Sequence, residues 1–302
     1  MLEFEPLQLD MKPLFDSYVK PGEYMHADAS FANLYVWQEA WDIRIAVAGN
    51  ALFIHMDSDI YKPFMIPPFL KDKEESIAPY IHMCEEYMTK KWGVFYIKSA
   101  LPETVEKIKH DCGKRYMFEY DGYNSEYVYL AEDLINLPGK KYHSKRNHIN
   151  VFLRNYNSVF EPYEDKYRQE CLDLQAEWAK SKNNGNPRED AEEMLSIQKT
   201  LDHWRELGLK GCVVKIAGKV AAFSFGERLN KETAFIHIEK AKPGISGLFT
   251  YVNQAFVENM WSDCKYINRA EDMGVEGIRK AKQSYHPVMM LENYDVLLSG
   301  EE

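Results

Sequence analysis

The sequence lacks the features that define several protein classes. Its five cysteines are scattered along 302 residues, odd in number and never in a CxxC spacing: Cys84, Cys112, Cys171, Cys212 and Cys264. A cysteine zinc site and a disulfide framework are therefore excluded, no metal is expected, and reduced thiols in a cytoplasmic protein are predicted. No segment approaches the roughly 18 uninterrupted apolar residues of a membrane-spanning helix. The N-terminal residues also lack the pattern of a secretory signal, so no integral membrane segment is expected.

Positive charge is also scarce. The chain has 37 Lys and Arg against 47 Asp and Glu, which gives a formal net charge of −10. Proteins that coat nucleic acids collect cations to displace counterions, so this balance excludes DNA as a partner but allows one local basic site. Hydrophobic residues at 45% and charged residues at 28% are typical of a globular protein.

Helix and strand patterns alternate along the whole chain, which predicts an α/β (α+β) fold. The linker signal Leu137-Pro138-Gly139 divides the chain into domains at 1–138 and 139–302. The second part reads as strand, two helices, three strands, a loop, helix, strand, helix and strand. We expect mixed central sheets flanked by helices in both domains, and we find no sequence repeat between them.

A basic segment opens the second part. YHSKRNHINVFLRNY (142–156) has helical periodicity, yet Lys145 and Arg146 fall in the same arc as its apolar residues Ile149, Phe152, Leu153 and Tyr156. Residues 139–155 contain five Lys and Arg and no acid, so the rest of the chain carries −15. One basic patch on an acidic body favours a single anionic ligand. Lys145, Arg146 and Asn147 either line a cleft between the domains as phosphate ligands, or the cations snorkel into solvent.

Two further segments carry candidate site residues. Alternation in TAFIHIEK (233–240) places Phe235, His237 and Glu239 on one face, where His237 or Glu239 would act as a base; an internally paired face is the alternative. In the following loop, Gly244 and Gly247 come after Lys240 and precede a helix. Its first amides would hold an anion, unless the loop is an ordinary turn.

The segment INRAEDMGVEGIRKAKQSYHP (267–287) supplies the remaining candidates. Asn268 ends a predicted strand, and Glu271 and Asp272 follow it in a loop where ligands gather in sheets of this kind. Arg279 and Lys282 lie three residues apart on one helix face and would bind phosphate. The alternatives are an N-cap role for Asp272 and a solvated basic stripe.

Four blocks in this order resemble a bacterial family related to the C-terminal domain of phosphatidylglycerol lysyltransferases: YHSKRNHINVFLRNY, GKVAAFSFGE, HIEKAKPGISGLFTYVNQAF and INRAEDMGVEGIRKAKQSY. The early SFANLYVW is similar too, so the resemblance covers nearly the whole chain. The order of elements in the second part also matches the GNAT (N-acetyltransferase) superfamily. The resemblance implies tandem GNAT-like domains.

The resemblance also implies an activity. Relatives of the lysyltransferase and Fem types move an aminoacyl group from a charged tRNA to an amine or hydroxyl. We therefore expect an acyltransferase that binds the acceptor end of a tRNA and needs no further cofactor. Glu239, Glu271 and Asp272 would bind the ammonium of the amino acid. Tyr285 lies where many N-acetyltransferases place the tyrosine that protonates the leaving group, although His286-Pro287 departs from their pattern. Acyl-CoA as the donor and a non-catalytic module for an anionic ligand are the alternatives.

Overall fold

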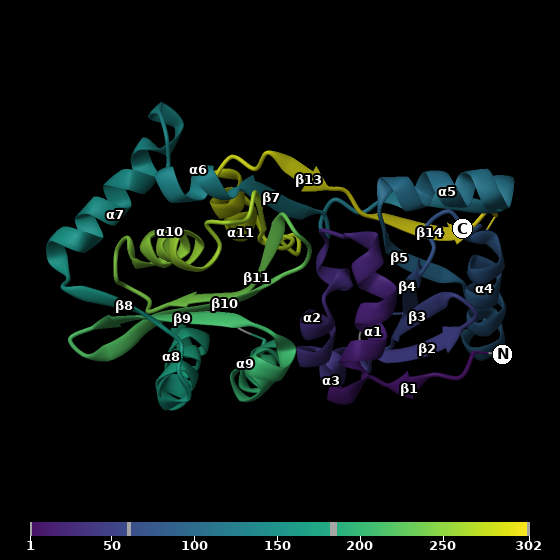
Figure 1. Ribbon diagram of the computed structural model, residues 1–302, viewed down its shortest axis with the longest axis horizontal. Coiled ribbons are helices and arrows are strands. Elements are labelled where there is room, and N and C mark those ends of the chain that lie inside the picture. Colours follow the sequence, from purple (N-terminus) through teal and green to yellow (C-terminus); the bar gives the residue numbers. More distant parts are fainter. Residues whose placement is uncertain (1, 59–61, 182–185, 301–302) are drawn as a thin grey trace. The chain divides into compact units, whose positions relative to one another are not determined.

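The computed structural model describes residues 2–58, 62–181 and 186–300, and the chain folds as two compact units (Figure 1). The first unit comprises Met1–Tyr127, Glu271–Arg279 and Met290–Glu302, and the second comprises Val128–Ala270 and Lys280–Met289. This division differs from the predicted boundary after residue 138. The sequence order of the strands does not reveal which sheet each strand joins.

The first unit is built on a seven-stranded mixed sheet of order β1-β2-β3-β4-β5-β14-β6. Its strands are β1 (Glu5–Pro6), β2 (Arg44–Ala48), β3 (Ala51–Met56), β4 (Phe64–Leu70), β5 (Tyr96–Ala100), β6 (Tyr116–Tyr120) and β14 (Tyr294–Leu298). Its helices are α1 (Lys12–Val19), α2 (Phe31–Val36), α3 (Gln38–Trp41), α4 (Ala78–Trp92) and α5 (Pro102–Cys112). The last strand of the chain thus lies between β5 and β6, which corrects our assignment of it to the second domain.

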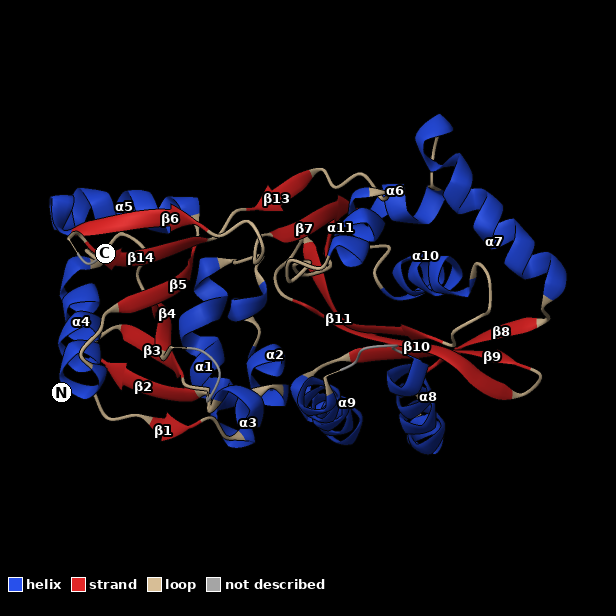
Figure 2. Cartoon of the chain, turned by 180° about the vertical axis from the view of Figure 1, so that it is seen from behind, coloured by secondary structure: helices blue, strands red, loops and turns tan. Residues whose placement is uncertain are grey.

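The second unit is built on a sheet of order β13-β7-β12-β11-β10-β9-β8. Its strands are β7 (Glu126–Leu130), β8 (Ser158–Pro162), β9 (Lys210–Ile216), β10 (Lys219–Arg228), β11 (Thr233–Ala241), β12 (Tyr266–Asn268) and β13 (Met289–Leu291). Its helices are α6 (Ala131–Asn136), α7 (His143–Asn155), α8 (Arg168–Ser181), α9 (Pro187–Leu207) and α10 (Leu248–Met260). Helix α11 (Glu276–Gln283) is divided between the units after Arg279, and the first two residues of β7 and the last two of β13 are likewise assigned to the first unit. Figure 1 and the reverse view in Figure 2 show α8 and α9 on one face of β8–β11 and α10 on the other.

Among the strand pairs with a described register, each sheet contains one parallel pair, and the others are antiparallel. In the first unit β4 runs parallel to β5, and in the second β11 runs parallel to β12. The glycines at 49 and 218 predict two hairpins, and both are present: Gly49 (φ 58°) turns β2 into β3, and Gly218 (φ 80°) turns β9 into β10. A third hairpin expected from the sequence, between 118–121 and 126–130, is wrong, because β6 and β7 belong to different sheets. Both glycines occupy the left-handed backbone conformation that a tight hairpin turn demands. Of the helices described, none is both long and apolar enough to cross a membrane.

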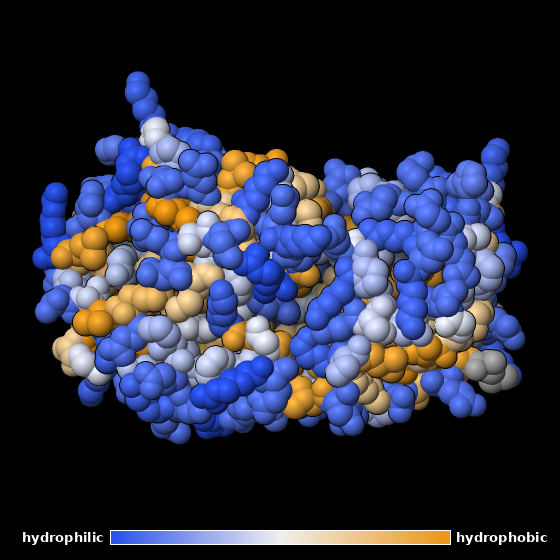
Figure 3. Space-filling model, viewed as in Figure 1, coloured by the Kyte–Doolittle hydropathy of each residue, from blue (hydrophilic) through white to orange (hydrophobic). Residues whose placement is uncertain are grey.

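Helix α7 departs from the predicted packing in one residue. Ile149 and Phe152 are buried as expected, but Leu153 is 50% exposed. In the space-filling view, apolar side chains interrupt the hydrophilic surface of the second unit over α7 and α10 (Figure 3). Half-exposed Leu153 and Phe249 contribute to the apolar surface of these two helices.

Candidate active site

A buried ion pair lies at the carboxyl ends of the two parallel strands of the second unit. Glu239, near the end of β11, and Arg269, just after β12, have side chains that are only 7% and 10% exposed, and Arg269 Nη2 lies 2.9 Å from Glu239 Oε1. Helix α10 covers this face of the sheet, and its Asn253 Nδ2 donates to Glu239 Oε2 at 2.9 Å. Parallel strands bring their carboxyl ends to the same edge, which is where α/β proteins bind ligands.

An aromatic ring and a second cation adjoin this pair. Tyr285, which follows α11, is 4% exposed; Arg269 Cζ lies 4.9 Å from the centre of its ring and Lys145 Nζ lies 3.7 Å from it. Burial, together with the nearby charge of Arg269, lowers the pKa of Lys145 to about 8, although the charge of Glu239 opposes this shift. Burial also raises the pKa of the Tyr285 hydroxyl, which therefore keeps its proton at neutral pH.

The loop that carries Arg269 is held by hydrogen bonds within the second unit. Lys282 Nζ donates to the carbonyl oxygens of Arg269 (2.6 Å) and Ala270 (3.0 Å), and Asn268 Oδ1 accepts from the Ala270 amide at 2.8 Å. Tyr129 donates to the Lys282 carbonyl at 2.9 Å. Ala270 adopts φ 58°, a backbone conformation that costs on the order of 1 kcal/mol for an alanine. These contacts fix the direction of the Arg269 side chain.

Two buried polar atoms beside the ion pair have no partner among the described residues. They are Arg269 Nη1, a donor, and Asn253 Oδ1, an acceptor. Asn253 is 1% exposed. Because buried polar atoms are almost always hydrogen-bonded in folded proteins, a donor and an acceptor left over beside one carboxylate indicate a place for a polar ligand.

The start of α10 is covered by α7. Gly247 (φ 80°) is the N-cap of α10, and a Cβ atom on it would lie 2.1 Å from the His148 carbonyl oxygen and 3.0 Å from Phe152 Cβ. The Phe152 and Tyr251 rings extend this contact, with centroids 4.9 Å apart. The His148 carbonyl, which carries partial negative charge, therefore lies against the N-cap of α10, the end of the helix that favours anions.

The family follows from comparison with known proteins. The model of the family "Phosphatidylglycerol lysyltransferase, C-terminal" matches residues 22–297. The chain belongs to this family. It is 31% identical to a conserved protein of unknown function from Bacteroides thetaiotaomicron VPI-5482, with 99% of this chain and 100% of that chain covered and a TM-score of 0.92. No curated protein matches it.

More distant structures have the same fold. L-PGS from Bacillus licheniformis is 18% identical, with 89% of this chain and 92% of that chain covered and a TM-score of 0.61. A tandem GNAT protein from the clavulanic acid biosynthesis pathway is 11% identical, with both chains covered in full and a TM-score of 0.53. The predicted tandem GNAT fold is therefore confirmed, and the fold of this family member is that of GNAT-type acyltransferases.

Several site residues predicted from the sequence lie near the ion pair, and others lie elsewhere. Glu239, Tyr285 and Lys145 surround Arg269, and Lys282 and Asn268 hold its loop. Arg146 instead donates to the carbonyl oxygens of Leu137 and Gly139, at 2.8 Å for the latter, and so ties the preceding turn to α7. Asn147 is exposed.

The Phe235 and His237 rings lie in contact, with centroids 4.5 Å apart, but the prediction that Glu239 shares their face is wrong because β11 is bulged. Ser224 pairs with Glu239 and Gly226 pairs with Ile236, so His237 is the extra residue between them. Such a bulge reverses the alternation of side chains. Glu239 faces α10, whereas His237 lies with Glu227, whose Oε1 is 2.9 Å from His237 Nε2.

The remaining predicted cations have carboxylate partners. Lys240, on the face of α8 and α9, lies 2.6 Å from Glu193 and over the Trp178 ring. Glu271, Asp272 and Arg279 belong to the first unit. Arg279 and Asp272 form an ion pair at 2.9 Å, and the Tyr127 hydroxyl donates to Asp272 Oδ2 at 2.6 Å. The ion pair with Arg279 holds the pKa of Asp272 below its usual range. Because α11 begins at Glu276, Asp272 is not its N-cap; its Oδ1 instead accepts from the Gly274 amide at 2.8 Å, in the turn before the helix.

Our sequence reasoning missed Arg269 and Asn253. Arg269 could have been predicted, because it directly follows Asn268 at the end of a strand, where ligands gather in sheets of this kind. Asn253 carries no such signal, because a polar residue within an amphipathic helix is ordinarily exposed.

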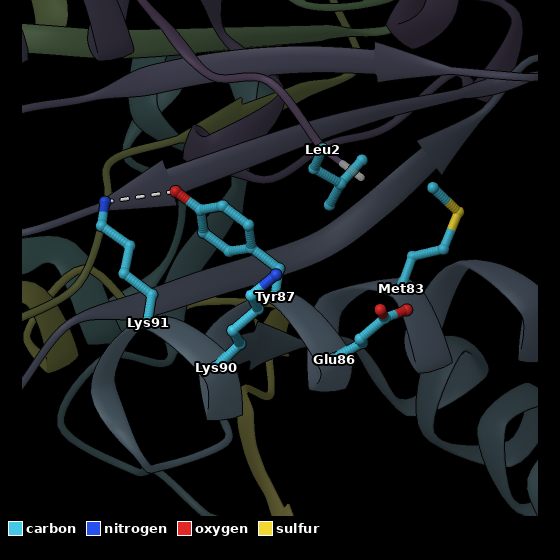
Figure 4. Close-up of a pocket in the computed structure, with 6 residues that line it drawn as sticks. All are labelled: Leu2, Met83, Glu86, Tyr87, Lys90 and Lys91. Atoms are coloured by element: carbon cyan, nitrogen blue, oxygen red, sulfur yellow. Dashed lines mark hydrogen bonds between the residues drawn. The ribbon is translucent and has the colours of Figure 1, made fainter.

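A separate cavity of about 330 Å³ lies beside α4 in the first unit (Figure 4). It is lined by Leu2, Met83, Glu86, Tyr87, Lys90 and Lys91. Lys91 Nζ donates to the Tyr87 hydroxyl at 3.2 Å, as the dashed line in Figure 4 marks. This lining has no buried donor and acceptor of the kind found beside Arg269, so we place the candidate active site in the second unit.

Proposed function

We propose that this protein transfers an aminoacyl group from an aminoacyl-tRNA to an amine or hydroxyl acceptor. The observation that carries the choice of donor is the packing of α7 against Gly247. The alternative donor, acyl-CoA, needs the amides at the start of α10 for its pyrophosphate, and the His148 carbonyl lies over that turn. An aminoacyl ester has no pyrophosphate and therefore does not need the amides of α10.

The surface of the second unit supports an RNA ligand. Lys140 and Lys141, just before α7, and Arg154, within it, are exposed in a stretch without acidic residues, although Lys141 Nζ lies 3.4 Å from Asp133 Oδ2. The lysines that precede the glycine loop do not add to this charge, because Lys242 lies 3.0 Å from Glu177 and Lys240 is paired with Glu193. The exposed cations of α7 and of the turn before it give an acidic protein a local site for a phosphate backbone.

The residues around the ion pair have the chemistry that such a transfer requires. Asn253 Oδ1 accepts a hydrogen bond from the ammonium of the amino acid, and Arg269 Nη1 donates to the ester carbonyl oxygen, where negative charge develops during attack. Glu239 keeps both side chains oriented. No metal is needed for these steps, and none of the described residues form a cluster of three or more His, Cys, Asp or Glu that would hold one.

Proton transfer falls to Lys145 and Tyr285 in this proposal. The neutral form of Lys145 takes a proton from the attacking amine or hydroxyl as the new bond to the carbonyl carbon forms. The bond between that carbon and the ribose oxygen then breaks, and Tyr285 donates its proton to the departing oxygen. Tyr285 recovers a proton from Lys145, so no net proton is gained or lost.

A panel of tRNAs charged with labelled amino acids, incubated with the protein and a cell extract as the source of acceptor, tests the proposal. We expect label from at least one tRNA to move to an acceptor with the wild-type protein, and not with Arg269→Gln. Lys242→Gln, which alters an exposed pair away from Arg269, serves as the matched control and should transfer at the wild-type rate. Absence of transfer across the whole panel, or binding of CoA that competes with tRNA, would contradict the proposal.

A further inference from the structure

The first unit contains a notch where its two parallel strands separate. Strands β4 and β5 share a single register pair, Met65 with Ile97, and diverge beyond it. The sequence explains why: Pro67 and Pro68 have no amide hydrogen and cannot continue the hydrogen-bond ladder. The notch is lined by residues 66–69 of β4 and by Ser99, Leu101 and Thr104 on the other side, and it encloses about 30 Å³. We call it the β4–β5 notch.

A histidine with an unsatisfied nitrogen lines this notch. His26 is 5% exposed, and its Nδ1 has no hydrogen-bond partner among the described residues. Its ring is fixed between two aromatic rings, parallel to Phe69 at 6.1 Å and edge-on to Tyr24 at 5.3 Å. Burial lowers the pKa of His26 to about 4, so the imidazole is neutral at pH 7 and one of its nitrogens is an acceptor.

A carboxylate short of positive charge lies beside the histidine. Asp28 also lines the notch, and the hydroxyl of Ser99, held at φ 62°, bonds to it. The nearest cation, Lys98, is shared with two other carboxylates, Asp121 at 3.2 Å and Asp295 at 3.5 Å. Burial, together with the nearby charge of Glu271, raises the pKa of Asp28 to about 6 although Ser99 and Lys98 oppose this shift, so negative charge here is incompletely compensated.

We propose that the β4–β5 notch binds the primary ammonium group of an amine ligand, with Asp28 as its counter-ion and His26 Nδ1 as a hydrogen-bond acceptor. The charge requires a cation, and the unsatisfied acceptor requires a group that donates hydrogen bonds. A primary ammonium can donate a hydrogen bond to His26 Nδ1, whereas a quaternary ammonium has no N–H to donate. Within the described residues, no third His, Cys, Asp or Glu joins His26 and Asp28, which argues against a metal ion. This site is independent of the transfer reaction proposed above.

Two ligands of equal charge test the proposal on the full chain. In an NMR titration at constant ionic strength, n-butylammonium chloride should shift the ring signals of His26 and saturate with a Kd of about 1–10 mM, the range of a small fragment. N,N,N-Trimethylbutylammonium chloride, which carries the same charge but no N–H, should leave them unchanged. Equal shifts from both salts, or none from butylammonium, would overturn the proposal. Shifts from ammonium chloride without any from butylammonium would also overturn it, since the notch would then hold only an inorganic ion.

Substitution of the counter-ion provides the second test. Asp28→Asn preserves the size of the side chain and removes its charge, so butylammonium should bind at least about tenfold more weakly, as for the loss of one desolvated charged contact. Asp10→Asn, in an exposed position of the same unit, is the matched control and should bind as the wild type does. Unchanged affinity in Asp28→Asn would refute the role of Asp28. If this variant fails to fold, the comparison of the two salts on the wild-type chain still decides.

Discussion

The ammonium group of Lys145 lies 3.7 Å from the centre of the Tyr285 ring. This contact places a basic residue of α7 over the tyrosine that follows α11, both in the second unit. Cation–π attraction favours the charged form of the lysine. Burial and the nearby Arg269 charge favour the neutral form and win, because the pKa of Lys145 falls to about 8.

The first prediction is a pH dependence of transfer that originates in Lys145. If its neutral form is the base, the transfer rate should rise as pH increases through about 8 and then level off. Lys145→Met should be slower by about 10²–10⁴-fold, the usual contribution of a general base, and should lose this rise. Rates measured between pH 6.5 and 9.5, corrected for ester hydrolysis without protein, provide the check. A Lys145→Met variant with the same profile as the wild type would show that another group titrates.

The lowered pKa of Lys145 should also make the stability of the folded protein depend on pH. The pKa of Lys145 is lowered on folding, so between about pH 8 and 10.5 the unfolded chain binds more protons than the folded one. The free energy of unfolding of the wild type, measured relative to Lys145→Met, should therefore increase with pH across this window. Urea unfolding at pH 7, 8.5 and 10 measures it. A difference that is constant with pH would mean that Lys145 is protonated in the folded state throughout.

The second prediction concerns the buried ion pair. Glu239→Leu leaves Arg269 buried without its carboxylate, and Arg269→Met leaves Glu239 without its cation; each should lower the free energy of unfolding by about 3–5 kcal/mol. The double variant should lose clearly less than the sum, because neither charge is then buried alone. Transfer should be abolished in all three.

The exposed pair Arg188–Glu192 is the control for this cycle. Its side chains are 43% and 26% exposed and lie one helical turn apart at 2.7 Å. Its coupling energy should be only about 0.3–0.5 kcal/mol. A coupling at Glu239–Arg269 as small as this one would show that the buried pair does not hold the site together.

The sequence was sufficient to predict the tandem GNAT fold but not the exchange of strands between the units. Periodicity and turn residues located β2, β3, β9 and β10, because these elements are defined by neighbours in sequence. Strand β14 pairs with β5 and β6, nearly 200 residues away, and its apolar pattern suits either sheet equally. Non-local pairing of this kind leaves no trace in local patterning.

The same limit applied to the candidate site. Strand alternation brought Glu239 to attention, helical spacing brought Lys145, and the resemblance to N-acetyltransferases brought Tyr285. The bulge at His237 depends on register between β10 and β11, which no residue of β11 reveals alone. The burial of Asn253 and the pairing of Arg269 with Glu239 likewise follow from which helix covers which face of the sheet.

The third prediction concerns the basic surface of α7. Arg154→Gln removes an exposed cation, so tRNA binding should weaken about 3–10-fold at low salt, and the slope of log Kd against log salt should fall by about 1. Lys166→Gln is the control, since Lys166 is 57% exposed but outside this surface. Filter binding at three salt concentrations measures both variants. Equal effects from the two substitutions would indicate only a general response to net charge.

The last prediction separates backbone strain from the contact between α7 and α10. Gly244 and Gly247 both have left-handed backbone, with φ 82° and 80°, so alanine at either position is strained by about 1 kcal/mol. Only at Gly247 would the new methyl group meet another backbone, the His148 carbonyl oxygen at 2.1 Å, whereas no atom lies within 4 Å at Gly244. Gly247→Ala should therefore lower the free energy of unfolding by at least about 2 kcal/mol more than Gly244→Ala, since α7 must move to admit the methyl group. Urea unfolding of the two variants measures the difference. Equal losses would mean that α7 does not press on the start of α10, and the argument against acyl-CoA as the donor would then fail with it.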